Sequence, residues 1–140
     1  MRILISACLA GWRCRYDGNH YLDRKILTLL STHELIPICP EVLGGLPIPR
    51  EPAKIEGGDG RDVLKGQARI FLRSGKDVTE NFLKGANKIL NIAQQTEAQR
   101  AVLKEGSPSC GVKKFGDKKP GMGVTAALLK THNIKVEGRL

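Results

Sequence analysis

The sequence predicts an α/β fold in which a mainly parallel sheet carries helices on both faces. Short apolar runs rich in isoleucine, leucine and valine alternate with segments whose apolar residues recur at helical spacing, which is typical of such sheets. The 140 residues are enough for one domain, 1–140, with its own core. Apolar residues at 41% and charged residues at 26% lie near the averages of globular proteins, which argues against a disordered chain.

The first elements are expected to be a strand, a helix and a strand. Residues 2–6, RILIS, form an apolar run typical of a buried strand. Residues 23–33 predict a helix because isoleucine and leucine recur on one face, and Asp23 can begin it. Residues 35–38 predict the second strand. Pro37 has no amide hydrogen to donate, so this strand should lie at an edge or end there.

The rest of the chain continues the alternation after an irregular stretch. Residues 40–60 are rich in proline and glycine and predict a long loop, which in a compact domain is usually functional or mobile. The expected elements that follow are a strand or hairpin arm at 67–72, the longest helix at 78–96, a strand at 100–103, a helix at 123–132 and a last strand at 134–136.

The formal net charge of +9 comes from the second half of the chain. Residues 1–60 carry seven Lys/Arg and seven Asp/Glu, whereas residues 61–140 carry sixteen and seven. A basic half favours an anionic partner such as a nucleotide phosphate or RNA, although a solvated lysine surface explains it equally well.

The sequence indicates a cytoplasmic protein without a membrane partner. No apolar run approaches the roughly 18 residues of a membrane span. Residues 5–8 imitate a lipoprotein cleavage site, but too few residues precede them for a signal peptide. In a reducing cytoplasm, cysteines serve metal binding or catalysis more often than disulfides.

Three of the four cysteines follow predicted strands. Cys8 comes two residues after the first strand, Cys39 directly follows the second, and Cys110 lies in the turn after strand 100–103. Parallel sheets collect ligands beyond the carboxyl ends of their strands, so these thiols are expected to meet there. Cys14 lies in the first of these loops.

Soft thiolate ligands select zinc, copper(I) or an iron–sulfur cluster. A [4Fe–4S] cluster on three cysteines leaves one iron open, as in a catalytic metal site. Four cysteines could instead close a zinc site, but the close C-x-x-C pairs typical of zinc are missing. Ordinary small buried residues are the remaining interpretation.

Several motifs over most of the chain resemble the bacterial thiouracil desulfidase family. They are SACLAG (6–11) with CRYDG (14–18), CPEVLGGLP (39–47) with Pro49-Arg50, LKEGSPSCG (103–111) and GMGVTAALL (121–129). The resemblance implies a Rossmann-like three-layer domain with a [4Fe–4S] cluster on Cys8, Cys39 and Cys110, and with Cys14 outside the ligand set. It also implies Glu41 and Ser107 as catalytic groups.

The activity that the resemblance implies is the non-redox removal of sulfur from thiouracil or thiouridine nucleotides, with release of hydrosulfide. In this hypothesis the substrate sulfur binds the open iron, Glu41 takes a proton from water, and Ser107 orients the water or moves a proton. Tyr16 is a candidate to stack on the pyrimidine, and Ser109 is the rival serine. Candidates to attract a phosphate are Lys113, Lys114, Lys118 and Lys119.

Two details limit the resemblance. Lys54 stands in Pro52-Ala53-Lys54 where the family pattern leads us to expect an acid. Some relatives carry a further domain associated with tRNA, which a chain of this length leaves no room for, so a small substrate is favoured over intact tRNA. The rival functions are a small basic RNA-binding module with a structural zinc and a metal-free thiol enzyme that uses Cys110.

Overall fold

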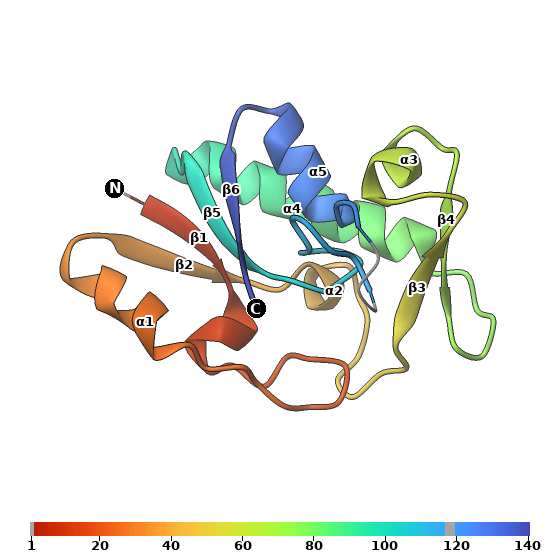
Figure 1. Cartoon of the computed structure of the whole chain (residues 1–140), viewed down its shortest axis with the longest axis horizontal. Helices are drawn as coiled ribbons and strands as arrows, with labels where there is room; N and C mark the ends of the chain where they lie inside the picture. The colour runs from red at the N-terminus through yellow and green to blue at the C-terminus, as the bar shows by residue number, and fades with distance from the viewer. Residues whose placement is uncertain (1, 117–119) are drawn as a thin grey trace.

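The computed structural model describes residues 2–116 and 120–140, and within them a four-stranded parallel sheet forms the centre of the molecule (Figure 1). Its strands run in the order β2-β1-β5-β6. Their bounds are Arg2–Ser6 for β1, Glu34–Ile38 for β2, Arg100–Lys104 for β5 and Lys135–Arg139 for β6. Pro37 lies in the edge strand β2, as its missing amide hydrogen led us to expect.

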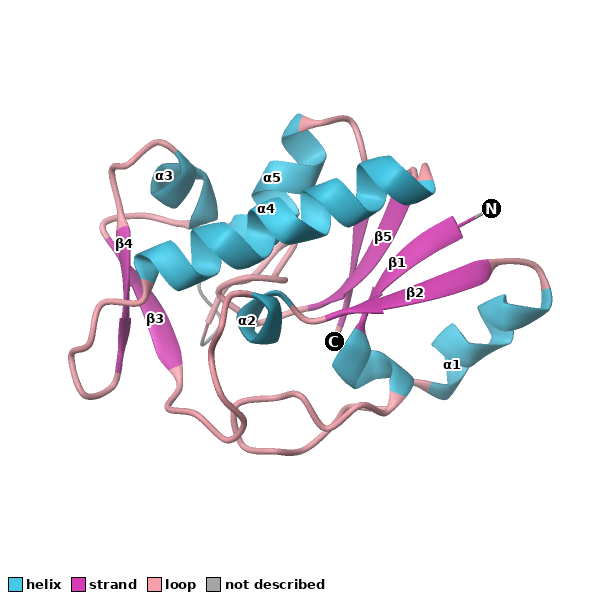
Figure 2. Ribbon diagram, turned by 180° about the vertical axis from the view of Figure 1, so that it is seen from behind, coloured by secondary structure: helices cyan, strands magenta, loops and turns pink. Residues whose placement is uncertain are grey.

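Helical segments cover both faces of this sheet, which confirms the predicted α/β fold (Figure 2). On one face, Leu4 and Leu103 of the sheet are buried against α4 and α5. On the other, Ile3 and Ile5 are buried against Ile26 and the turn after β1. The bounds are Thr79–Thr96 for α4, Val124–Thr131 for α5, Arg24–Leu27 for α1, and Ala7–Ala10 and Thr28–Ser31 for the 3-10 turns η1 and η2.

The helix expected at 23–33 is shorter than its sequence pattern suggested. Asp23 begins it as predicted, because its carboxylate accepts the N–H groups of Lys25 and Ile26. After Leu27 the chain tightens into the 3-10 turn η2. The hydroxyls of Thr28 and Ser31 donate to carbonyls three residues earlier, and such local bonds compete with a regular helix.

The stretch predicted as a long loop contains regular structure. It holds α2 (Pro40–Leu43) and β3 (Ala53–Glu56), and β3 pairs antiparallel with β4 (Arg69–Leu72). Residues 67–72 therefore contain a hairpin arm outside the parallel sheet, one of the two predicted possibilities. The sequence did not reveal β3 because Ile55 is the one fully buried side chain among its four residues, which is too little for an alternating pattern.

Two glycines allow α2 to lie directly against α4. A Cβ atom on Gly85 would stand 2.0 Å from the carbonyl oxygen of Pro40, and one on Gly44 would stand 2.0 Å from the carbonyl oxygen of Asn81. Both neighbours are backbone atoms, which cannot rotate away. The long helix thus fixes the position of α2, and with it the residues that begin α2.

A buried carboxylate ties α3 (Gly60–Leu64) to the segment that leads into α5. Asp59 forms a capping box with Asp62 at the start of α3, and its Oδ2 accepts the N–H of Met122 at 3.0 Å. Burial opposes the ionisation of Asp59. The ion pair with Arg61 and the N–H groups of Met122 and Arg61 outweigh burial and lower its pKa to about 2.

Replacing Asp59 with asparagine should remove a pH-dependent part of the free energy of unfolding. Because the folded pKa lies below the ordinary value of 3.8, the stabilisation is present above about pH 4 and is lost as the pH falls through 2. The shift corresponds to about 2 kcal/mol. Urea titrations should show that Asp59→Asn lowers the free energy of unfolding by this amount at pH 7 and by much less at pH 2.5. An equal loss of unfolding free energy at both pH values would contradict this explanation. The control is Glu34→Gln, which changes an exposed carboxylate.

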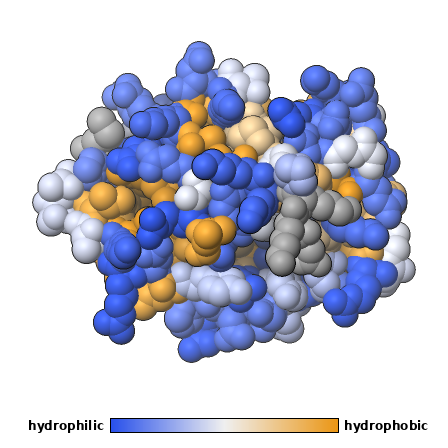
Figure 3. Space-filling view, in the orientation of Figure 1, coloured by the Kyte–Doolittle hydropathy of each residue, from blue (hydrophilic) through white to orange (hydrophobic). Residues whose placement is uncertain are grey.

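Hydrophilic side chains dominate the face of the molecule seen in Figure 3, in agreement with the large number of charged residues. Among the described residues, no helix combines the length and apolar character that a membrane crossing requires.

Candidate active site

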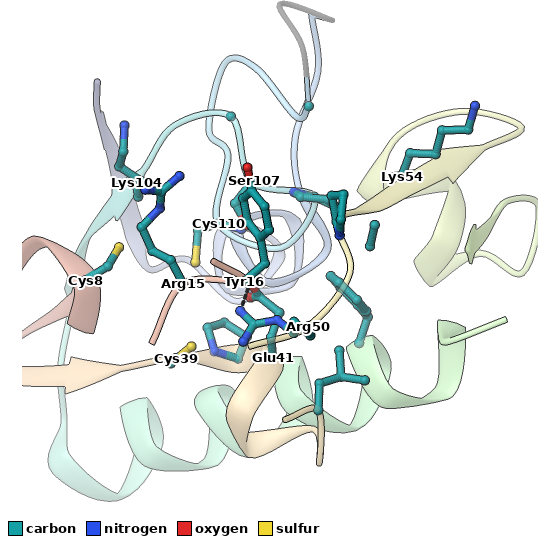
Figure 4. A pocket seen from close by; sticks show the side chains of 18 of the residues that line it. Cys8, Arg15, Tyr16, Cys39, Glu41, Arg50, Lys54, Lys104, Ser107 and Cys110 are labelled. Atoms are coloured by element: carbon teal, nitrogen blue, oxygen red, sulfur yellow. Dashed lines mark hydrogen bonds and ion pairs between the residues drawn. The ribbon is translucent and has the colours of Figure 1, made fainter. Parts of the chain in front are cut away.

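The four cysteines all line one pocket at the carboxyl edge of the parallel sheet. Figure 4 shows three of them, Cys8, Cys39 and Cys110. This pocket has a volume of about 1250 Å³, and all four thiols are free. Cys8 lies in η1 directly after β1, Cys39 precedes α2 after β2, and Cys110 lies in the loop after β5. The chain crosses from one side of β1 to the other between β2 and β5, so the pocket is at the switch point where open α/β sheets bind ligands.

Cys14 lies among the other thiols and shares polar contacts with two of them. The Cys39 thiol donates to the carbonyl oxygen of Cys14 at 3.8 Å. The hydrogen bond with Cys39 lowers the pKa of the Cys14 thiol, but the hydrogen bond with Cys8 and burial outweigh it and raise the pKa to about 11. The sequence placed Cys14 in the same loop as Cys8 but gave no sign of this contact.

The thiols at the back of the pocket are held in their neutral form. The hydrogen bond with Cys14 and burial raise the pKa of Cys39 far above the ordinary value. Burial, with the nearby charge of Glu41, does the same for Cys110. Buried neutral thiols without a cationic partner are poor nucleophiles, which argues against attack on a substrate by these cysteines. A metal ligand must also be a thiolate, so binding of a metal group here would displace the thiol protons.

The described side chains do not form a site for a single metal ion. Within residues 2–116 and 120–140, no three His, Cys, Asp or Glu side chains stand close enough together to hold one ion. A cubane cluster differs, because each thiolate binds a separate iron and the thiols therefore stand farther apart. Cys8, Cys39 and Cys110 come from three separate loops and line the same pocket.

Glu41 lies in the first turn of α2, two residues after Cys39, and lines the pocket. Its Oε2 accepts a hydrogen bond from the Arg50 guanidinium at 3.2 Å. Its Oε1 is buried and has no partner among the described residues. No side chain caps α2, so Glu41 does not serve as the helix cap. A buried carboxylate oxygen left without a partner is costly and indicates a site for a ligand or water.

Arg50 fixes the carboxylate of Glu41 in place. Its side chain is only 5% exposed, and it also donates to the carbonyl oxygens of Cys14 at 3.0 Å and Pro47 at 3.2 Å. Its backbone N–H donates to the carbonyl oxygen of Tyr16. Arg50 thus connects α2 to the loop that carries Cys14. Arg50 lies within one of the quoted motifs, but the sequence did not indicate that it pairs with Glu41.

Ser107 lines the pocket and also shapes the turn before Cys110. Its Oγ accepts the backbone N–H groups of Ser109 and Cys110, each at 3.1 Å. The hydroxyl hydrogen of Ser107 is therefore available to donate, and the two incoming hydrogen bonds make it a stronger donor. Ser107 therefore both stabilises this turn and presents a hydrogen-bond donor to the pocket.

Ser109 points into the core. It is fully buried, and its Oγ lies 2.7 Å from the Oγ1 of Thr125 in α5. It is not among the residues that line the pocket. Pro108 and Ser109 also contact Gly123, where a Cβ atom would stand 2.5 Å from the Ser109 backbone. Ser109 therefore holds the turn against α5.

The other predicted substrate-binding residues lie nearer the rim. Tyr16 lines the pocket and is 42% exposed. Lys114 lines it as well, whereas Lys113 is exposed outside it. Glu105 accepts the backbone N–H groups of both lysines, which anchors this glycine-flanked segment. Lys118 and Lys119 lie outside the described residues.

Two cations that the sequence did not single out line the same pocket. Arg15 lies over the ring of Tyr21, 3.8 Å from its centroid, and the Nζ of Lys104 lies 4.3 Å from the same centroid. Lys104 is the last residue of β5; it lies within the motif at 103–111, but the sequence analysis gave it no role.

Comparison with known proteins gives three consistent results. A sequence model of the 2-thiouracil desulfurase family matches residues 3–138. A protein of Bacillus subtilis (strain 168), called uncharacterized protein YbbK, is 48% identical over an alignment of 140 positions that covers 96% of this chain and 93% of that protein. A solved structure described as the [4Fe-4S]-dependent thiouracil desulfidase TudS superposes with a TM-score of 0.84 at 36% identity, covering 98% of this chain and 89% of that one.

Proposed function

Because the chain belongs to the 2-thiouracil desulfurase family, we propose that it is a desulfidase that converts thiouracil, or a thiouridine nucleotide, to the uracil form by hydrolysis of the C=S bond. The observation that carries the proposal is one pocket that combines thiols from three strand ends with the unpartnered Oε1 of Glu41. In the balanced reaction, water forms a C–O bond, the C–S bond breaks, and uracil, hydrosulfide and one proton are released.

The cofactor we propose is a [4Fe–4S] cluster held by Cys8, Cys39 and Cys110. The solved relative TudS is described as [4Fe-4S]-dependent, and all three positions line the pocket in this chain. When bound by three cysteines, such a cluster supplies one open iron, a thiophilic Lewis acid that polarises a C=S bond and accepts sulfide. Cys14 stays outside the proposed ligand set.

Glu41 is proposed as the general base. Arg50 occupies Oε2, so Oε1 is the atom available to take a proton from the attacking water. Ser107 is proposed to donate its hydroxyl hydrogen to the pyrimidine or to the leaving sulfur, because its Oγ already accepts two N–H groups. Of the two protons of water, one leaves through Glu41 and the other ends on hydrosulfide. Ser107 keeps its own proton and holds the substrate by a hydrogen bond.

The rival functions receive less support from the site. A thiol enzyme based on Cys110 conflicts with the burial that raises the pKa of this thiol. A structural zinc conflicts with the lack of a suitable ligand set in the described ranges. The basic second half of the sequence is compatible with a nucleotide substrate as well as with RNA.

Hydrosulfide release from 2-thiouracil and 4-thiouracil tests the proposed activity. Protein reconstituted with iron and sulfide under anaerobic conditions should produce uracil and hydrosulfide in equal amounts without added reductant. Absence of turnover by fully loaded protein with bases and nucleotides alike would refute the proposal, and a requirement for reductant would refute its non-redox chemistry.

A further inference from the structure

Cys14 is the thiol of the pocket that the proposed function does not use. It is buried in one apolar cluster with Cys8, and Cys39 packs against that cluster. The Cys14 thiol shares a hydrogen bond with each of these two thiols. Its sulfur therefore already lies beside the sulfur atoms with which it could form a covalent bond.

A tight reversal of the chain brings Cys14 back to Cys8. The 3-10 turn η1 ends at Gly11, whose φ of 93° lies in the left-handed region that glycine adopts readily. The N–H of Gly11 donates to the carbonyl oxygen of Cys8 at 3.2 Å. At the far end of the reversal, the carbonyl oxygen of Cys14 accepts a hydrogen bond from Arg50 at 3.0 Å. The backbone itself thus holds Cys14 against Cys8.

Cys8 is better placed to react with an oxidant than the thiols at the back of the pocket. Figure 4 shows it on the same side of the pocket as Lys104 and Arg15. Burial lowers the pKa of Lys104 and the nearby Cys8 opposes this change, so the two groups interact. Thiols beside a cation are the ones that react readily. Cys39 and Cys110, whose pKa values are raised by their surroundings, should react more slowly.

We propose that Cys8 and Cys14 are a modification site, a reversible disulfide that forms when the protein without a cluster meets hydrogen peroxide. The peroxide converts the Cys8 thiol to a sulfenic acid, and one water is released. The Cys14 sulfur then displaces the hydroxyl group of the sulfenic acid, so that an S–S bond forms and a second water leaves. Two thiols are oxidised, one peroxide is reduced, and both thiol protons end in water.

The disulfide protects Cys8 from damage and gives Cys14 a role outside the ligand set. A sulfenic acid that meets no second thiol is oxidised further to a sulfinic acid, which thiols do not reduce. A disulfide, in contrast, is returned to two thiols by exchange with a dithiol. While the bond exists, Cys8 cannot bind iron. This modification goes beyond the proposed desulfidation and depends on the positions of the thiols alone.

The test uses the full chain, freed of iron with a chelator and then treated with an excess of hydrogen peroxide. Peptide mapping without reductant should find Cys8 joined to Cys14, with the other two of the four thiols still free. Cys14→Ser protein should instead carry a sulfinic acid at Cys8. After treatment with a dithiol and anaerobic reconstitution, the wild type should regain most of its iron, and Cys14→Ser about 3- to 10-fold less.

Cys110→Ser is the matched control, because it removes a pocket thiol that hydrogen-bonds to Ser6 and lies outside the pair. This variant should still form the disulfide, and melting temperatures before oxidation check the fold of every variant. The modification site is refuted if the oxidised wild type has no bond between Cys8 and Cys14, if Cys14 pairs with Cys39, or if Cys8 becomes a sulfinic acid as extensively in the wild type as in Cys14→Ser. Lack of desulfidase activity in loaded wild-type protein would refute the proposed function and leave the disulfide standing.

Discussion

Replacing Glu41 with glutamine is expected to lower the turnover rate for thiouracil about 100- to 10,000-fold, with iron content unchanged. The amide nearly matches the carboxylate in size but cannot accept a proton from water. Its oxygen can still accept the Arg50 hydrogen bond now made to Oε2, so the helix and the pocket should keep their shape. Turnover and substrate affinity are measured separately on iron-matched samples.

Glu51→Gln is the matched control for this experiment. Glu51 also lines the pocket, but its Oε1 already accepts the backbone N–H of Ser74, and it is exposed. The turnover rate of Glu51→Gln should stay within about 3-fold of wild type. The carboxylate is exposed, and an amide oxygen can accept the same hydrogen bond, so the substitution should disturb the site little. Glu41→Gln protein that turns over at the wild-type rate would exclude Glu41 as the base.

Replacing Arg50 with methionine is expected to lower the free energy of unfolding by about 3–5 kcal/mol and to impair catalysis. The change leaves the Glu41 carboxylate, whose side chain is only 16% exposed, without its cation. It also removes the donors to the carbonyl oxygens of Cys14 and Pro47. Urea unfolding of the full chain measures the stability, and steady-state kinetics measure the activity.

The ion pair between Arg100 and Glu137 provides the control for Arg50. Both of its side chains are about one-third exposed, 29% and 34%, and the pair is bidentate, so Arg100→Met should cost about 1 kcal/mol, well below the cost of Arg50→Met. A double-mutant cycle with Glu41→Gln then tests whether Arg50 affects catalysis through Glu41. If Arg50 acts through Glu41, Arg50→Met should cost much less activity in the Glu41→Gln background. Equal stability losses for Arg50→Met and Arg100→Met would contradict this account.

The sequence was sufficient to predict the sheet and its ligand-binding edge. The alternation of strands and helices gave the parallel topology, and Pro37 indicated the edge position of β2. Strand ends alone indicated where Cys8, Cys39 and Cys110 would lie, because parallel strands bring their carboxyl ends together. The roles of these residues came from the family resemblance, and for the individual residues they stay predictions.

Features that depend on tertiary contacts could not be read from the sequence. β3, the partner of β4 in the hairpin, lies within a proline- and glycine-rich stretch whose composition favours a loop. The resemblance implied Ser107 as the catalytic serine with Ser109 as its rival, and only the packing of α5 shows that Ser109 bonds to Thr125. Arg50 and Lys104 gain their partners through folding, so local pattern gives no sign of their surroundings.

Iron and acid-labile sulfide per chain, measured after anaerobic reconstitution, test the central claim most directly. The wild-type protein should bind about four of each. Replacing any of Cys8, Cys39 and Cys110 with serine should remove most of both, whereas Cys14→Ser should retain them. Wild-type protein that binds zinc or no metal, or a Cys14→Ser variant that loses the cluster while one of the other three variants keeps it, would contradict the account.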